Sequence, residues 1–290
     1  MFMTKRSPSV AKGLYKVLLA IDKPYENLLF SRIINRSTFC RLANGRAFFS
    51  AMLGNGYKVK FAFDKKSGLY EISDKNYVIK AHHEKLALWS YQRGIINRAE
   101  QMGEIYHLQN IEFGDGDVVI DCGANIGDLA LYFKNHKLAV EYIGIEPAPL
   151  EYECLVHNVA PMQCHNLGLW FENGSIDFYL AGQKGDSSFI EPRHFDSVVK
   201  VETVRLDQLI DREIKLLKIE AEGGEPEVLM GAEKLLPKVE FISADLGFER
   251  GPTAESTLVP VMNFLMERNF ELVAISHKRV VALFRNKGLN

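Results

Sequence analysis

The chain contains few cysteines, and none of the four (Cys40, Cys122, Cys154 and Cys164) belongs to a Cys-x-x-Cys pair. This excludes a disulfide framework, and we expect reduced cysteines in a cytoplasmic protein. No run of about 18 uncharged apolar residues occurs, which excludes a membrane-spanning helix. The basic N-terminus is followed by no small-residue cleavage site, so we expect no signal peptide.

The 290 residues are 47% hydrophobic and 25% charged, which is typical of a globular protein with a sizeable core. The net charge of −2 hides an asymmetry. Residues 1–50 contain nine Lys/Arg against two Asp/Glu, whereas residues 111–290 contain 17 against 29. A basic front suggests peripheral contact with an anionic phospholipid surface or a phosphorylated glycan. A solvated helix face packed on the acidic body explains the pattern equally well.

The first part of the chain differs from the rest in its pattern of apolar residues. Apolar residues at helical spacing predict helices within residues 1–50 and 84–109. Three short alternating runs, at 57–63, 68–72 and 76–80, predict a small antiparallel meander. We therefore divide the chain into a basic helical and β-meander region, residues 1–85, and a larger domain, residues 86–290.

Strands and helices alternate from residue 115 onward, which predicts an α/β fold whose parallel sheet is covered by helices on both faces. The expected apolar strands are 117–121, 141–146, 163–167, 200–206, 215–220 and 239–246. Residues 271–276 and 279–285 are expected to form a closing hairpin. The Asn173-Gly174 turn predicts a second hairpin, between 169–171 and 175–180.

One glycine loop carries the clearest chemical signal. Strand 117–121 ends in Asp121-Cys122-Gly123-Ala124-Asn125-Ile126-Gly127-Asp128. Gly123 and Gly127 permit a tight turn and close approach of a ligand to the backbone. Glu146 ends the next strand, where a carboxylate can accept hydrogen bonds from both hydroxyls of a ribose.

Two cofactors fit this layout. A dinucleotide fingerprint reads Gly-x-Gly-x-x-Gly, but here Asn125 replaces the second glycine and two acids flank the loop. Such acids disfavour a pyrophosphate and suit the ammonium and sulfonium of S-adenosylmethionine, although an inert glycine turn remains an alternative. The expected cofactor residues are Asp121, Gly123, Ala124, Asn125, Gly127, Glu146 and Pro147, with Asn166 and Leu167 at the adenine edge.

Several segments resemble the FkbM family of S-adenosylmethionine-dependent methyltransferases. They are DCGANIGD, YIGIEPAP, LVHN, GDSS (185–188), VETVRLDQL (201–209) and LLKIEAEGGEPEVLMGA (216–232). Family members usually read KIDVEG where this chain has Lys218-Ile219-Glu220-Ala221-Glu222-Gly223. The resemblance spans residues 115–275 and implies a Rossmann-like class I methyltransferase sheet of seven strands ending in an antiparallel hairpin. It also implies O-methylation of hydroxyls on sugars or polyketide-type natural products.

A hydroxyl acceptor must lose its proton, so we expect a base at the carboxyl ends of the central strands. Glu220, Glu222 and Asp245 are the candidate catalytic residues, with Asp245 and Glu220 flanking the acceptor. Lys218 could neutralise Glu220, whereas Asp245 has no obvious partner in the sequence. Ser187, Glu249 and Arg250 are candidates for gripping a polar substrate. Direct base action is favoured over Mg²⁺ held by these carboxylates, and no metal site is predicted.

The sequence thus predicts a cytoplasmic O-methyltransferase that acts on a sugar, glycan or glycolipid precursor. The alternatives are a non-catalytic S-adenosylmethionine-binding scaffold and a methyltransferase of a small natural product. A nucleic-acid partner is not expected, because EAEGGEPE stands where an Asn/Asp-Pro-Pro-aromatic motif would favour base methylation, and the body is acidic. The loop chemistry disfavours nicotinamide-dependent oxidation, and the oligomeric state is left open.

Overall fold

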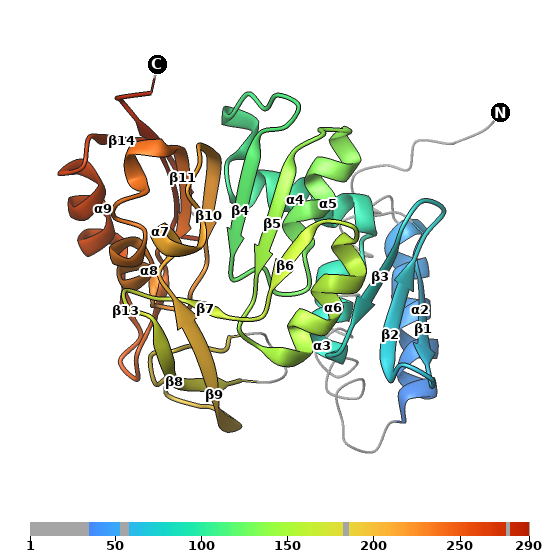
Figure 1. Cartoon of the computed structure of the whole chain (residues 1–290). Coiled ribbons are helices and arrows are strands. Elements are labelled where there is room, and N and C mark those ends of the chain that lie inside the picture. Colours follow the sequence, from blue (N-terminus) through green and yellow to red (C-terminus); the bar gives the residue numbers. More distant parts are fainter. Residues whose placement is uncertain (1–34, 53–57, 182–185, 277–278, 290) are drawn as a thin grey trace, which may run out of the picture.

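The computed structural model describes residues 35–52, 58–181, 186–276 and 279–289. Its centre is a seven-stranded sheet in the order β14-β15-β11-β10-β4-β5-β6 (Figure 1). The parallel strands are β4 (Val118–Cys122), β5 (Glu141–Ile145), β6 (Gln163–His165), β10 (Ile214–Ile219) and β11 (Val239–Asp245). The antiparallel pair β14 (Phe270–Ile275) and β15 (Val281–Asn286) closes the sheet beside β11. This confirms the predicted Rossmann-like sheet and its closing hairpin.

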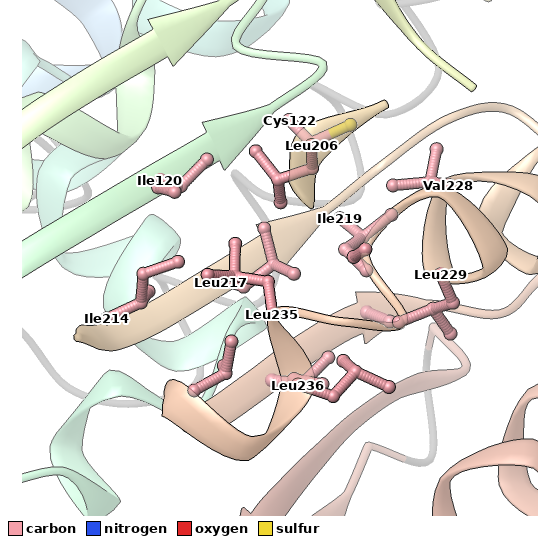
Figure 2. Close-up of a cluster of buried hydrophobic side chains, with 14 of the residues drawn as sticks. Ile120, Cys122, Leu206, Ile214, Leu217, Ile219, Val228, Leu229, Leu235 and Leu236 are labelled. Carbon is pink, nitrogen blue, oxygen red and sulfur yellow. The ribbon is translucent and has the colours of Figure 1, made fainter. Parts of the chain in front are cut away.

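Helices cover both faces of the sheet, which explains the continuous apolar runs of its strands. Along β4, Val118 and Ile120 pack in one hydrophobic cluster and Val119 in another, because successive side chains point to opposite faces. One face is covered by α4 (Ile95–Ile105), α5 (Asp128–His136) and α6 (Pro149–Val159). The other is covered by α7 (Leu206–Leu209), α8 (Glu225–Gly231) and α9 (Leu258–Met266), and Figure 2 shows part of this core around β10 and α8.

The predicted meander is present as an antiparallel sheet in the order β1-β2-β3. It consists of β1 (Lys60–Asp64), β2 (Leu69–Ser73) and β3 (Val78–Ala81), preceded by α2 (Arg36–Met52). The basic residues at positions 1–34, and the helices expected there, lie outside the described residues. The surface role expected for the basic front therefore stays a prediction.

The expected division between residues 85 and 86 falls inside α3 (Glu84–Tyr91). Leu88 and Tyr91 of this helix pack in one hydrophobic cluster. That cluster contains both Phe39 and Ile72 of the N-terminal region and Leu131 and Cys154 of the larger domain, so the division stays a prediction. The helix expected over 84–109 is interrupted at Gly94, whose φ of 108° no other residue adopts readily. α4 follows, and a short 3₁₀ helix, η1 (Leu108–Asn110), ends the segment.

One buried amide joins the N-terminal region to the larger domain. β3 lies beside α6 (Figure 1), and Asn158 of α6 hydrogen-bonds both backbone groups of Lys80, accepting at 2.7 Å and donating at 2.9 Å. The same amide donates to the carbonyl of Ile126 at 2.8 Å. The meander is therefore tied directly to the loop that follows β4.

A small sheet beside the main one corrects two expectations. It consists of β7 (Gly168–Leu169), β8 (Gly174–Leu180) and β9 (Ser197–Val204) in the order β7-β9-β8. The predicted hairpin is wrong, because β9 lies between its arms, and Thr203 pairs with Gly168 on one side and Gly174 on the other. β9 was expected in the parallel sheet. Its eight residues instead pair with β7 along one edge and with β8 along the other.

Three short elements complete the description. After β11, the strands β12 (Phe248–Arg250) and β13 (Glu255–Ser256) form a small hairpin. The 3₁₀ helix η2 (Leu236–Lys238) precedes β11. Within the described residues, no helix combines the length and apolar character needed to cross a membrane.

Candidate active site

A cavity of about 350 Å³ opens at the carboxyl ends of β4, β5 and β10. Small-ligand clefts are commonly about 300–1,000 Å³, and open α/β sheets bind ligands at this edge. Eleven of the sequence-predicted site residues line it: Asp121, Gly123, Ala124, Asn125, Glu146, Pro147, Leu167, Ser187, Glu220, Glu222 and Glu249. The other four, Gly127, Asn166, Asp245 and Arg250, do not.

The loop after β4 is held against the loop after β10. Gly123 has a φ of 70°, and a Cβ atom at this position would lie 1.9 Å from the carbonyl oxygen of Glu220. The N–H groups of Gly123 and Ala124 both donate to the carbonyl of Ile145 at 3.0 Å. Glycine is therefore required at position 123 by the backbone conformation and by the space available.

Glu146 is fixed at the end of β5 with its carboxylate toward the cavity. Its Oε2 accepts from the N–H of Asn125 at 2.7 Å, and its Oε1 accepts from the N–H of Ala148 at 2.8 Å. Burial, with the nearby Glu151, raises the pKa of Glu146 to about 8. Since a carboxylate oxygen accepts more than one hydrogen bond, both oxygens can still receive ligand hydroxyls.

Asn166 and Gly127 position the site from outside the cavity. The exposed Asn166 amide donates to the carbonyls of Glu146 at 2.9 Å and Pro147 at 3.2 Å, which fixes the backbone after β5. Gly127 precedes α5, and a Cβ atom there would lie 2.5 Å from Val159 of α6. Gly127 therefore allows α5 and α6 to pack closely.

The acids that flank the glycine loop are already paired, which the sequence did not predict. Asp121 forms an ion pair with Lys218 at 2.9 Å and accepts from the Tyr142 hydroxyl at 2.6 Å. Asp128 accepts from Arg98 at 2.5 Å and from the hydroxyl of Tyr91. Both partnerships join residues far apart in sequence.

The cavity wall is nevertheless strongly acidic. Among its lining residues, eight carry carboxylates (Asp121, Asp128, Glu146, Glu151, Asp186, Glu220, Glu222 and Glu249) and three carry basic groups (Arg98, Lys218 and Arg279). When ionised, such an excess of acidic side chains in a cleft attracts a ligand of the opposite sign. A cationic ligand is therefore favoured over a pyrophosphate.

Glu220 has a full set of donors. Arg279 donates to Oε1, the hydroxyl of Tyr106 donates to Oε2, and Lys218 lies 3.4 Å from Oε2. Burial alone raises the pKa of Glu220, but the two cations reverse this and lower it to about 2. A carboxylate held in this way is a weak base.

Asp245 does not line the cavity and is 0% exposed. The sequence shows no obvious partner for Asp245, but in the structure Arg279 donates to its Oδ2 and the N–H of Gly247 donates to Oδ1 at 3.1 Å. Arg279 was missed in the sequence. The feature that could have indicated it is a basic residue just before the last strand. Because β15 pairs antiparallel with β11, a residue that precedes β15 lies near the carboxyl end of β11.

Arg250 does not line the cavity. Its guanidinium donates to both carboxylate oxygens of Glu227, at 2.7 and 2.9 Å, and to the carbonyl of Gly223. It thereby ties the β12–β13 hairpin to α8 and to the loop after β10. The Ser187 hydroxyl, which does line the cavity, accepts from the N–H of Ala181 at 3.0 Å.

Glu222 and Glu249 behave differently from the other acids. Among the described residues, neither carboxylate has a hydrogen-bond or ion-pair partner, and both are partly buried. Burial and neighbouring carboxylates raise the pKa of Glu249 to about 8 and that of Glu222 well above its usual value. Over the part of the chain that the structure describes, no three His, Cys, Asp or Glu side chains converge to hold a metal.

The sheet order, and the position of this cavity at the carboxyl ends of the strands, define a Rossmann-like domain. The Methyltransferase FkbM domain matches residues 121–272, and the chain therefore belongs to the FkbM family of S-adenosylmethionine-dependent methyltransferases. It is 26% identical over 180 residues to "2-O-methyltransferase NoeI" of Sinorhizobium fredii, and this match covers 54% of this chain and 73% of the relative. It is 27% identical over 150 residues to "Methyltransferase 1" of Beauveria bassiana, and this match covers 42% of this chain and 60% of the relative.

Among solved structures, the chain is similar to the methyltransferase FkbM of Methylobacillus flagellatus. The TM-score is 0.46 and the sequence identity 17%, over 65% of this chain and 50% of the other.

Proposed function

We propose that this methyltransferase transfers the methyl group of S-adenosylmethionine to a hydroxyl of a sugar, glycan or glycolipid precursor. The observation that carries the proposal is that one cavity contains both Glu146 and the partnerless carboxylates of Glu222 and Glu249. Methylation of a neutral hydroxyl requires an acceptor for its proton, and a carboxylate near the reacting oxygen supplies one. The name of the relative NoeI, a 2-O-methyltransferase, agrees with oxygen as the acceptor atom.

The residues present fit this methyl donor. Glu146 would accept hydrogen bonds from the ribose hydroxyls, the backbone of residues 123–125 would adjoin the methionyl part, and Leu167 would contact the adenine. When bound, S-adenosylmethionine supplies an electrophilic methyl carbon on a cationic sulfur. The acidic wall suits that positive charge, since its eight acidic side chains outnumber its three basic ones and it becomes more negative as Glu146 and Glu249 ionise around their pKa of about 8.

The chain's own residues then have to orient the acceptor hydroxyl, exclude water and remove a proton. Glu220 is disfavoured as the proton acceptor because its pKa is lowered to about 2, against the effect of its burial, by Lys218 and Arg279. Asp245 is disfavoured because it lies outside the cavity. Glu222 and Glu249 are therefore the favoured bases, acting directly.

Methyl transfer to a panel of acceptors tests the proposal. The full chain is incubated with S-adenosylmethionine carrying a radiolabelled methyl group and with methyl glycosides, chitotetraose, a glycolipid, a plant phenol or RNA. We expect label in a saccharide, in an alkali-stable ether linkage rather than an ester. Label only in the phenol or RNA would overturn the saccharide assignment. Binding of S-adenosylhomocysteine without transfer to any acceptor would identify the scaffold alternative.

A further inference from the structure

A second cavity adjoins the first. It has a volume of about 490 Å³ and shares three residues with the first cavity, Asp186, Glu222 and Glu249. Its remaining wall comes largely from the segment before β9 (Pro192–Asp196) and from the hairpin after β11, which contributes Phe248. The two partnerless carboxylates therefore stand where the two cavities meet.

Two aromatic rings in the second cavity are exposed. Phe248 is 69% exposed and Phe195 is 42% exposed, and both rings line the cavity. Exposed phenylalanine is costly in water, and aromatic surfaces beside polar groups are characteristic of ligand sites. A sugar ring matches this combination, because its C–H face packs on an aromatic ring while its hydroxyls meet carboxylates.

We propose that the second cavity is the acceptor site, where a sugar ring packs on Phe248 and Phe195 and the Glu222–Glu249 pair receives the proton of the reacting hydroxyl. This inference rests on the proposed function and extends it by assigning the acceptor to named residues. The transfer balances without any further reactant. The hydroxyl oxygen forms a bond to the methyl carbon, the carbon–sulfur bond breaks with its electron pair going to sulfur, and the hydroxyl proton passes to a carboxylate.

The backbone beneath the carboxylate pair is firmly held. The carbonyl of Glu222 accepts from the hydroxyl of Ser188 at 2.8 Å. Beside Glu249, Arg250 is anchored to Glu227 at 2.7 Å and to the carbonyl of Gly223. The two loops also touch at Gly223, where a Cβ atom would lie 2.5 Å from the Cα of Arg250. Both carboxylates are thus placed by a fixed backbone, while their side chains have no hydrogen-bond or ion-pair partner among the residues that the structure describes.

Binding is tested first, independently of turnover. Saturation-transfer NMR of a panel of methyl glycosides is recorded with the full chain saturated with S-adenosylhomocysteine. We expect wild-type signals from the C–H protons of at least one glycoside, weakened on the order of fivefold in Phe248→Ala, since aromatic contacts contribute about 0.5–1.5 kcal/mol. Phe171→Ala is the matched control, because Phe171 is 39% exposed but lines neither cavity. Equal signals in wild type and Phe248→Ala, or no wild-type signal, would overturn the acceptor site.

Turnover tests the carboxylates. With a glycoside that is methylated, we expect Glu249→Gln combined with Glu222→Gln to lower kcat by about 10²–10⁴-fold, the usual contribution of a general base. Glycoside binding by NMR and S-adenosylhomocysteine binding by calorimetry should change little. Full turnover in this double variant would remove the pair from the mechanism.

The two failures are distinguishable. A wild-type protein that binds glycosides at Phe248 but methylates none of them would break the proposed function and leave the cavity as a saccharide site. A wild-type protein that methylates a glycoside independently of Phe248, Glu222 and Glu249 would keep the function and overturn this inference.

Discussion

The two ends of the cavity differ in how their acids are held. At the end formed by β4 and β5, the three acids of the glycine loop and the next strand end all have partners: Asp121 pairs with Lys218, Asp128 at the start of α5 with Arg98, and Glu146 with two backbone N–H groups. At the other end, Glu222 and Glu249 have none among the described residues. Acidic side chains with hydrogen-bond or ion-pair partners and acidic side chains without them thus occur in one cavity.

This difference separates binding from chemistry. A carboxylate fixed by backbone donors presents one geometry to one ligand, as suits a cofactor that is always the same. A carboxylate without partners keeps its lone pairs available to a hydroxyl proton, which suits proton transfer. The raised pKa is shared by Glu146 and Glu249, so the difference between the two ends lies in the partners and not in the pKa. The energetic cost of burying two partnerless acids is the kind of local conflict expected at a functional site.

Removing a fixed acid should have the largest effect. Glu146→Ala deletes the acceptor for two ribose hydroxyls and releases the N–H groups of Asn125 and Ala148. Charge-assisted hydrogen bonds contribute about 1.5–3 kcal/mol each, so we expect S-adenosylhomocysteine affinity to fall by about 100-fold or more in calorimetry. Glu141→Ala is the control at the start of the same strand, where an exposed ion pair with Arg212 is lost. Similar affinities in the two variants would exclude Glu146 from the cofactor site.

Crowding the contact between the two loops should come next. In Gly123→Ala the new methyl group would meet the carbonyl of Glu220 at 1.9 Å, in a backbone with φ of 70°. Gly116→Ala is a matched control, because its φ is 83° and nothing lies within 4 Å. The control should lose about 1–2 kcal/mol of unfolding free energy from the left-handed backbone alone.

Gly123→Ala should therefore lose clearly more, about 3 kcal/mol or above, since buried clashes add about 1–3 kcal/mol. Chemical denaturation of both variants measures the difference. Equal losses would mean that the loops move apart freely, and that the fixed end of the cavity is less rigid than its contacts indicate.

The fixed end of the cavity was largely predictable from sequence. Gly123, Asn125 and Glu146 sit at the ends of strands marked by apolar runs, and the order of a doubly wound sheet brings those ends together. Arg279 was not predictable in the same way. Its partners Glu220 and Asp245 lie 59 and 34 residues away, and the contact depends on the antiparallel return of β15 beside β11.

The same limit explains Arg250 and the small sheet. A polar residue after a strand can face a ligand or a helix, and only the packing of α8 shows that Arg250 meets Glu227. The Asn173-Gly174 turn is a local signal, whereas the placement of β9 between β7 and β8 depends on a segment about 30 residues further along. Long-range pairings decided each correction.

A smaller effect, the pH dependence of ligand affinity, tests the end of the cavity that holds Glu222 and Glu249. The pKa of Glu249 is raised to about 8 by burial and by Asp245 and Glu220, with Arg279 opposing. Glu222 also faces Glu220, Asp186 and Arg279. The ionised form attracts a sulfonium and the protonated form does not, so a cationic ligand should bind more tightly as pH rises through about 8 and level off above it.

S-adenosylmethionine should therefore gain affinity relative to the uncharged sulfur of S-adenosylhomocysteine by up to about tenfold between roughly pH 6.5 and 8.5. The comparison cancels any contribution of Glu146, which both ligands meet alike. In Glu249→Gln the ratio of the two affinities, measured by calorimetry at each pH, should become flatter because the titrating charge is gone. A wild-type ratio independent of pH would show that the carboxylate pair does not face the sulfur, and would leave Glu249 with only the role in gripping the acceptor that the sequence predicts.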